Sequence, residues 1–461
     1  MFKKVFILVT VYVFLVGMVT RKELESVKEK VDSPATESTA TSETSQIKLT
    51  TVYEKTFDEE IVDVIFDTAT VTVAEAINMG WKESEFEGVE KTRGKAKITY
   101  PKVVFYGKEE WRRTRAIEGY IIASKIVFYD KDGKVKRELR LGGESDYYIN
   151  VSPNEKYIGV SKQFQKEGEK GKAAMLFDSE GNELLSFEKG QIVSPISDMG
   201  FVKYTPTSWD YDGFLIPICI YDLNKRKVVD YETLNPEIPN AEVGGDVFLE
   251  EGKYIFSWVS GVKKSVGKLI DVQAGKILWK KEYDFEITGD WRTVAGKEDL
   301  ELFCMCRKED YVYDIVALHW NTGEVLWSSR LGAPFSNILI DEYNNIYIAG
   351  FGYINSFTPK GKMRWYYEEQ EKPVKQFYPY RGTQLTYYIT LKLSGDQILS
   401  RGIIPEMIKG VWNWKSSEIL SLSKKDGKVI KKERFTGKVM MSSKGGKLGI
   451  VTNDKVIKIL K

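Results

Sequence analysis

Histidine and cysteine, on which many catalytic and metal sites depend, are scarce in this sequence. The 461 residues include one histidine, His319, and three cysteines, Cys219, Cys304 and Cys306. On a strand, Cys304 and Cys306 would point to the same face, too far apart for an easy bond, so the cysteines do not form a disulfide framework. We interpret them as free thiols and His319 as a surface residue in a hairpin turn. The sequence therefore predicts no catalytic residue, no metal site and no cofactor.

Motifs of several large enzyme and binding classes are also missing. The sequence contains neither a G-x-S-x-G elbow nor a Walker loop. Lysine and arginine number 68 against 66 aspartates and glutamates, and the basic residues are scattered without forming runs, so no nucleic-acid partner is expected. Asp130–Gly133 looks like the start of a calcium loop but lacks the downstream glutamate of a complete one. We interpret this segment as a plain turn.

What the sequence does contain is a short hairpin motif that recurs along the chain. An apolar strand runs into a polar turn that ends in glycine, which adopts a positive φ readily, and a second strand follows. A seventh copy, Ile220–Val229, lacks the glycine, and we expect it to turn at Asn224 because asparagine tolerates the left-handed region. The turn glycines of the other copies are Gly133, Gly181, Gly275, Gly323, Gly361 and Gly427.

The spacing of these turns, about 40 to 50 residues, is typical of four-stranded propeller blades. Each interval supplies two further strands, as residues 147–151 and 157–160 do between the first two turn glycines. Aromatic residues make up 13% of the chain, which suits a β-rich protein because flat side chains pack well between twisted sheets. The sequence therefore predicts an all-β fold, a β-propeller.

The two ends of the predicted propeller decide the number of blades. Ile47–Asp58 resembles the strand that follows a hairpin turn, yet it has no partner before it. Residues 438–442, 448–452 and 456–460 supply three strands with no outer strand after them. Joining them in one composite blade would close the ring and leave no exposed edge. We expect an eight-bladed propeller over residues 47–461, with seven blades as the alternative, and an insertion at about 68–97 with a short helix within Val73–Trp81.

The residues before the propeller resemble a leader and a linker. Met1–Lys4 is basic, and Val5–Thr20 has sixteen residues without a charge. This length lies between that of a secretory signal, about 7 to 15 apolar residues, and that of a bilayer span, about 17 to 25. Residues 1–20 are thus a signal peptide or an N-terminal membrane anchor, and either places the rest outside the cytoplasm. Residues 21–46 include a Ser/Thr-rich, aromatic-free tract, which predicts a flexible linker. Membrane contact is expected only through the N-terminal segment.

Two of the hairpins resemble a known family. Residues 317–327, Ala-Leu-His-Trp-Asn-Thr-Gly-Glu-Val-Leu-Trp, and Asp271–Trp279 are similar to the quinoprotein-type (PQQ-like) propeller repeat, in which a turn precedes an apolar pair and a tryptophan. The family includes quinone-dependent alcohol dehydrogenases and non-catalytic scaffolds such as the outer-membrane assembly lipoprotein. The dehydrogenases use a quinone, calcium, an aspartate and two adjacent cysteines. Here Met305 separates Cys304 from Cys306, and no stretch matches a calcium or quinone site. The resemblance therefore implies a scaffold more than a dehydrogenase.

Aromatic residues in irregular stretches are the candidate binding residues. The tryptophans at equivalent repeat positions, Trp279, Trp327 and Trp365, are interpreted as packing between neighbouring blades. Other aromatic residues lie in the long interval between Gly361 and Gly427 and in a shorter stretch before residue 213. On loops of a rigid ring they would offer a large contact area at low entropic cost. The candidates are Trp412, Trp414, Tyr378, Tyr380, Trp209 and Tyr211.

Together these features predict an extracytoplasmic propeller, secreted or anchored to the membrane, that binds or scaffolds a protein partner. One alternative is a propeller enzyme, either a quinone-dependent dehydrogenase or a lyase, hydrolase or transferase that uses Asp, Tyr or Arg. A second alternative is a carbohydrate-binding propeller, in which the same aromatic residues would hold a glycan.

Overall fold

The structure is a computed structural model in which the described part of the chain consists mainly of β-strands. It describes residues 50–460 except 91–92, 114–116, 142–146, 163–170, 207–217, 235–242, 262–263, 288–300, 310–311, 332–334, 351, 370–386, 409–410, 442–447 and 453–454. The expected leader (1–20) and linker (21–46) lie outside the described residues. Residues 47–461 form one compact unit. None of the helices in the described part is long and apolar enough to cross a bilayer.

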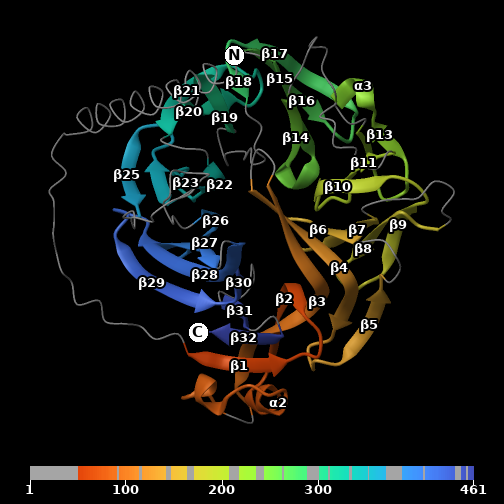
Figure 1. The fold of residues 1–461 in the computed structure, drawn as a ribbon, viewed down its shortest axis with the longest axis vertical. Coiled ribbons are helices and arrows are strands. Elements are labelled where there is room, and N and C mark those ends of the chain that lie inside the picture. Colours follow the sequence, from red (N-terminus) through yellow and green to blue (C-terminus); the bar gives the residue numbers. More distant parts are fainter. Residues whose placement is uncertain are drawn as a thin grey trace, which may run out of the picture. The chain divides into compact units, whose positions relative to one another are not determined.

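The described strands form six sheets of four strands and one sheet of eight. Neighbouring strands are antiparallel and mostly consecutive in the chain, because each is joined to the next by a short turn. Within residues 47–461 the sheets follow one another around a common centre, as the blades of a propeller do (Figure 1). The expected all-β propeller fold is confirmed.

The eight-stranded sheet consists of two groups of four strands. It contains β2 (Ile61–Thr72), β3 (Lys95–Arg113), β4 (Ile117–Tyr129), β5 (Val135–Arg140), β6 (Tyr147–Val151), β7 (Tyr157–Lys162), β8 (Ala174–Asp178) and β9 (Glu183–Phe187). The two groups meet where β4 pairs with β6, through Ile122 with Tyr148 and Ala123 with Tyr147.

Five of the four-stranded sheets use consecutive strands. They are β10 (Gln191–Ile196), β11 (Val202–Thr205), β12 (Cys219–Tyr221) and β13 (Lys227–Val229); β14 (Val243–Leu249), β15 (Tyr254–Gly261), β16 (Lys264–Asp271) and β17 (Lys276–Tyr283); β18 (Glu286–Ile287), β19 (Glu301–Glu309), β20 (Val312–His319) and β21 (Val325–Leu331); β22 (Phe335–Ile340), β23 (Ile346–Gly350), β24 (Tyr353–Phe357) and β25 (Met363–Glu368); and β26 (Tyr387–Ser394), β27 (Gln397–Ile408), β28 (Val411–Ser423) and β29 (Val429–Thr436).

The sixth four-stranded sheet combines strands from both ends of the propeller. Its strands, in order, are β1 (Thr51–Thr56), β32 (Val456–Leu460), β31 (Leu448–Thr452) and β30 (Lys438–Met441). β1 runs antiparallel to β32, from Thr56 opposite Val456 to Thr51 opposite Leu460. The predicted composite blade is confirmed, and β1 covers an edge of β32 that would otherwise be exposed.

The insertion is shorter than the sequence indicated. β2 and β3 stay paired up to Thr72 opposite Lys95, so the expected boundaries of 68 and 97 are wrong and the non-strand part is residues 73–94. Its helix α2 (Val73–Asn78) begins after Thr72, which forms a capping box with Glu75. The helix ends before Trp81 because Met79, its C-cap, leaves the helical conformation. A 3₁₀ turn, η1 (Glu83–Phe86), follows.

The remaining short helices lie next to strands. They are α3 (Tyr231–Leu234) and η2 (Glu250–Gly252).

The hairpin turns follow the expected chemistry with one exception. All six turn glycines have positive φ, between 63° and 87°. In the copy without glycine the positive φ, 58°, falls on Lys225 and not on Asn224. The Asp222 carboxylate accepts hydrogen bonds from the backbone N–H of Asn224 and Arg226, and this holds Asn224 in the turn and leaves the left-handed position to the next residue.

Candidate functional site

Most of the candidate aromatic residues lie outside the part of the chain that the structure describes. These are Tyr378, Tyr380, Trp209 and Tyr211. Trp412 and Trp414 are on β28, where Trp412 is opposite Met407 of β27. The expectation that this pair lies in an irregular loop is wrong, because β27 and β28 continue as a paired hairpin to Ile408 and Val411.

Of the scarce histidine and cysteines, the structure describes the side chains of His319 and Cys219. His319 ends β20, is half-buried, and its Nδ1 lies 3.3 Å from Thr322 Oγ1. Cys219 is half-buried and forms no disulfide within the described residues, and Cys304 and Cys306 occupy alternate positions of β19. The described residues include no group of three or more His, Cys, Asp or Glu side chains that could hold a metal ion.

The Asp130–Gly133 segment forms a plain turn, as expected. The Asp130 carboxylate accepts hydrogen bonds from the backbone N–H of Asp132 and Lys134, at 3.0 and 2.8 Å. The Gly133 N–H donates to the Asp130 carbonyl. The carboxylate thus accepts hydrogen bonds from the backbone of its own turn, as in an Asx turn.

Three repeat tryptophans connect neighbouring sheets, which confirms their structural interpretation. Each indole Nε1 donates a hydrogen bond to a backbone carbonyl in the turn of the next sheet, at 2.6 to 3.1 Å. The donor and acceptor pairs are Trp279 with Trp320, Trp327 with Pro359, and Trp365 with Lys424.

The same indole rings lie against the turn glycine of the next sheet. A Cβ at that glycine would come within 2.4 to 2.6 Å of the ring. The pairs are Trp279 with Gly323, Trp327 with Gly361, and Trp365 with Gly427. Each of these junctions is therefore filled by an indole that packs where a larger turn residue would not fit.

The junction between the composite sheet and the β4–β5 turn has a different composition. In the outer strands a buried residue follows the repeat tryptophan by four positions, as Tyr283 follows Trp279. By this pattern Tyr53 of β1, followed by buried Phe57, occupies the tryptophan position. Among the described residues only Lys55 Nζ would lie within 4 Å of a Cβ at Gly133. Here a tyrosine replaces the tryptophan, and its ring does not cover the turn glycine.

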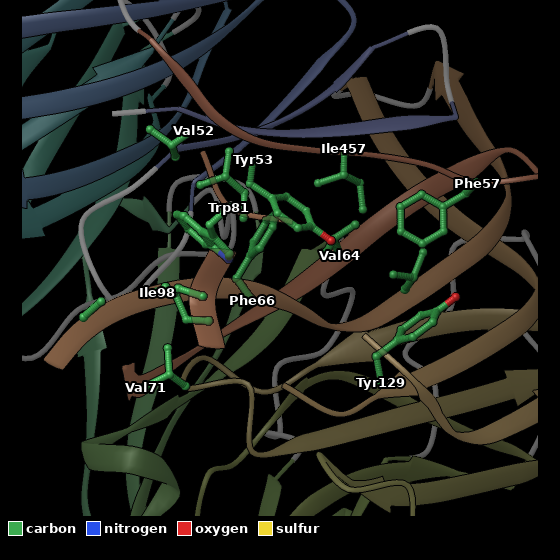
Figure 2. Packing of buried hydrophobic residues seen from close by; sticks show 14 of the residues in the cluster. Val52, Tyr53, Phe57, Val64, Phe66, Val71, Trp81, Ile98, Tyr129 and Ile457 are labelled. Carbon is green, nitrogen blue, oxygen red and sulfur yellow. The ribbon is translucent and has the colours of Figure 1, made fainter. Parts of the chain in front are cut away.

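A cavity of about 180 Å³ lies at this junction, and we call it the closure pocket. Its walls come from β1, from the residues after α2, from β3 and from the β4–β5 turn. Figure 2 shows the Tyr53 ring beside Trp81 of the insertion and Phe57 near Tyr129. The ring centres of Tyr53 and Trp81 are 5.7 Å apart, and those of Phe57 and Tyr129 are 6.1 Å apart. The lining residues are Tyr53, Glu54, Lys55, Phe57, Met79, Gly80, Trp81, Tyr100, Pro101, Tyr129, Lys131, Asp132 and Gly133.

The closure pocket combines one half-buried ammonium group with neutral aromatic walls. Lys55 Nζ donates to the Gly133 carbonyl at 3.2 Å and lies 4.9 Å from the ring centre of Tyr129 and 5.3 Å from that of Phe57. Burial lowers the pKa of Lys55, and the Asp130 carboxylate opposes this shift. Burial, with a smaller effect of Tyr129, raises the pKa of Tyr53 to about 12, so this phenol stays neutral at physiological pH.

The outer strands carry a second feature, a series of exposed apolar side chains that sequence reasoning did not assign to a surface. β17, β21, β25 and β29 lie at the outer edge of four successive sheets (Figure 1). Each carries two apolar side chains that are between 37% and 50% exposed. We call these the outer apolar pairs, and they are Ile277 and Leu278, Val325 and Leu326, Met363 and Tyr366, and Val429 and Ile430. On β17 and β21 the signal in the sequence was the apolar pair between the turn glycine and the tryptophan.

Comparison with known proteins gives structural likenesses only. No protein-family model matches the chain, and no curated protein matches it. Among solved structures, BamB from Moraxella catarrhalis is 13% identical, with 90% of this chain and 98% of that chain covered and a TM-score of 0.45. Sqt1 from Saccharomyces cerevisiae is 8% identical, with 74% and 92% covered and a TM-score of 0.44. Apo AztD from Citrobacter koseri is 13% identical, with 75% and 92% covered and a TM-score of 0.40. At these values the likenesses add nothing to the fold and function argued from this chain's own residues.

Proposed function

We propose that residues 47–461 act as a protein-binding or scaffolding propeller whose partner contacts the outer apolar pairs. The observation that carries this proposal is the repetition of exposed apolar side chains on four successive outer strands. Exposed apolar side chains that recur at one position of successive sheets offer a partner several apolar contact points. An outer strand also has a free edge to which a partner strand can add.

Charged residues next to the outer apolar pairs indicate the chemistry of the partner. Lys276 precedes the pair on β17, Glu324 precedes the pair on β21, and the pair on β29 lies between Lys428 and Lys431. Lys428 and Lys431 are ion-paired with Asp426 and Glu433, at 3.4 and 3.0 Å. A partner surface with an apolar centre and charged residues of both signs around it would complement this arrangement. The apolar centre would supply most of the affinity, and the charges would favour the correct orientation.

The proposal includes finer points of architecture and location. We take the eight-stranded sheet as two blades, which with the six four-stranded sheets gives an eight-bladed, PQQ-like propeller. Among the described residues its two halves share two residue pairs, which supports this division. We further propose that the propeller is extracytoplasmic, secreted or tethered by residues 1–20. The candidate aromatic residues, with Trp412 and Trp414 on β28, would add to the contact surface.

Site-specific photo-crosslinking in the cells that make the protein tests the partner surface. A benzophenone amino acid at Leu326 should crosslink to another protein, whereas the same group at Tyr343, which is 72% exposed on the β22–β23 turn, should not. The double variant Ile277→Asp, Leu326→Asp should abolish capture of the crosslinked partner. The variant should remain folded, because both side chains are exposed on the native surface.

Two outcomes would contradict this function. One is crosslinking at Tyr343 and Leu326 to the same extent, which would indicate nonspecific contact. The other is undiminished capture of the partner by the folded double variant, which would place the partner surface elsewhere.

A further inference from the structure

The closure pocket lies beside a turn of the same kind as one that holds an indole elsewhere in the protein. In the β24–β25 turn, the Thr358 N–H donates to the Lys362 carbonyl and the Gly361 N–H donates to the Thr358 carbonyl, at 2.8 and 3.0 Å. In the β4–β5 turn, Asp130 and Gly133 make the corresponding hydrogen bonds, at 2.9 and 3.0 Å. The two turns therefore present equivalent backbone groups.

This equivalence identifies the carbonyl that an indole would contact at the closure pocket. Trp327 donates from Nε1 to the carbonyl of Pro359, two residues before the turn glycine Gly361. The residue two positions before Gly133 is Lys131, which lines the pocket. The Lys131 carbonyl is thus the expected acceptor.

The walls and the size of the pocket also suit a flat aromatic ring. Tyr53, Trp81 and Tyr129 contribute aromatic surface, against which a ring can stack or lie edge-on. The Lys55 ammonium lies at the turn glycine, where it would meet the face of the ring in a cation–π contact. A cavity of about 150 Å³ is enough to hold benzene. This cavity measures about 180 Å³ and is partly open, so it can hold one ring of an indole while the rest extends toward the opening.

We propose that the closure pocket binds an indole ring of another molecule, in the place that the chain's own tryptophan fills at three other junctions. The ring packs between Tyr53, Trp81 and Lys55, and its N–H donates to the Lys131 carbonyl. The source is either a tryptophan side chain of a polypeptide or a free indole compound. This site is separate from the outer apolar pairs and does not depend on the proposed protein-binding role.

Methyl NMR on the full-length protein with ¹³C-labelled methionine methyl groups tests binding to the wild-type site. Met79 lines the pocket, whereas Met199 is exposed and lies outside the pocket lining. Indole should shift the Met79 methyl signal, assigned with Met79→Leu, with half-saturation at about 1 mM or below, and should leave the Met199 signal in place. 1-Methylindole lacks the N–H and should bind about fivefold more weakly.

Two tyrosine-to-tryptophan variants provide a matched pair. Tyr53→Trp restores the residue found at the other junctions and should fill the pocket, so that indole no longer binds. Tyr343→Trp places the same ring on an exposed turn and should bind indole as the wild type does. A capped Gly-Trp-Gly peptide separates the sources: binding at least as tight as that of indole supports a polypeptide tryptophan, and binding of indole alone supports a free compound.

Three results would overturn the proposal. The first is a Met79 signal in the wild-type protein that does not move up to the solubility limit of indole. The second is indole affinity in folded Tyr53→Trp equal to that of the wild type. The third is equal affinity for indole and 1-methylindole, which would show that the indole N–H does not donate a hydrogen bond to the Lys131 carbonyl.

Discussion

At the scale of single residues, glycine and tryptophan form matched pairs across the sheet junctions. Gly361 has a φ of 74°, which L side chains rarely adopt, and a Cβ there would lie 2.4 Å from the Trp327 ring. The turn conformation and the neighbouring indole therefore impose two separate requirements on one position. At Gly395 only the turn conformation requires glycine, since its φ is 55° and no described atom lies within 4 Å of the position of a Cβ.

This difference allows the two costs to be measured separately. Gly395→Ala should lower the free energy of unfolding by about 1 kcal/mol, the cost of a positive φ for alanine. Gly361→Ala should lower it by a further 1 to 3 kcal/mol, approximately, because the methyl group also displaces the Trp327 ring. Urea denaturation of both variants gives the comparison. Equal losses would show that the indole does not constrain the glycine.

At the scale of elements, the turns are held by aspartate carboxylates that accept hydrogen bonds from their own backbone. In each case one oxygen accepts from the N–H groups two and four residues later. The residues are Asp130, Asp178, Asp222 and Asp341. Asp341, in the β22–β23 turn, also accepts from the Tyr347 hydroxyl at 2.8 Å. These turns thus depend on charged groups, and the turns at Asp222 and Asp341 form without a glycine.

The Asp341 turn should make a pH-dependent contribution to stability. Burial raises the pKa of Asp341, but hydrogen bonds from Asn345, Tyr347 and the backbone outweigh it and leave the pKa below its usual value. A lowered pKa means that the contribution is complete above about pH 4, the unfolded value, and is lost as the pH falls through the folded value. Asp341→Asn should cost about 1 kcal/mol at pH 7 and progressively less below pH 4.

Urea denaturation between pH 7 and pH 2.5 provides the measurement. Asp132→Asn, an exposed aspartate in another turn, is the control and should leave stability nearly unchanged at every pH. A difference between wild type and Asp341→Asn that stays constant with pH would rule out the carboxylate as its cause.

At the scale of residues 47–461 as a whole, the composite sheet closes the propeller through β1 and β32. Glu54 and Lys458 lie opposite each other in this pairing, and their charged groups are 3.4 Å apart. Such a half-exposed ion pair contributes little by itself, so both residues can be replaced without large loss. The antiparallel backbone pairing supplies the connection.

A disulfide across this pair should form and should stabilise the propeller. In Glu54→Cys, Lys458→Cys the new thiols should oxidise readily and raise the free energy of unfolding by about 2 to 4 kcal/mol, since the bond joins residues far apart in sequence. Peptide mapping by mass spectrometry identifies the bond. The control, Glu54→Cys with Asp271→Cys on β16, should not form it. Failure of the first pair to oxidise would contradict the closure.

Much of this architecture could be predicted from the sequence because it follows from local chemistry. A glycine in a turn indicates a positive φ at its own position. The N-terminal strand lacked a partner and the three C-terminal strands lacked an outer strand, so their pairing could be predicted. The closure pocket could not be predicted, because it depends on Trp81 of the insertion lying beside the Tyr53 ring, a contact between distant residues. The extended hairpin that carries Trp412 and Trp414 was missed for a similar reason, since each strand is stabilised by the other.

The pairing of β1 with β32 has a consequence for folding during synthesis on the ribosome. Thr51–Thr56 emerges early, yet its hydrogen-bonding partners, Val456–Leu460, are translated about 400 residues later. At about 5 to 20 residues per second, the strand remains without its strand partner for tens of seconds. During that interval its exposed edge can pair with other chains. We expect holdase chaperones to bind nascent chains that end before residue 456 more strongly than chains that include β32.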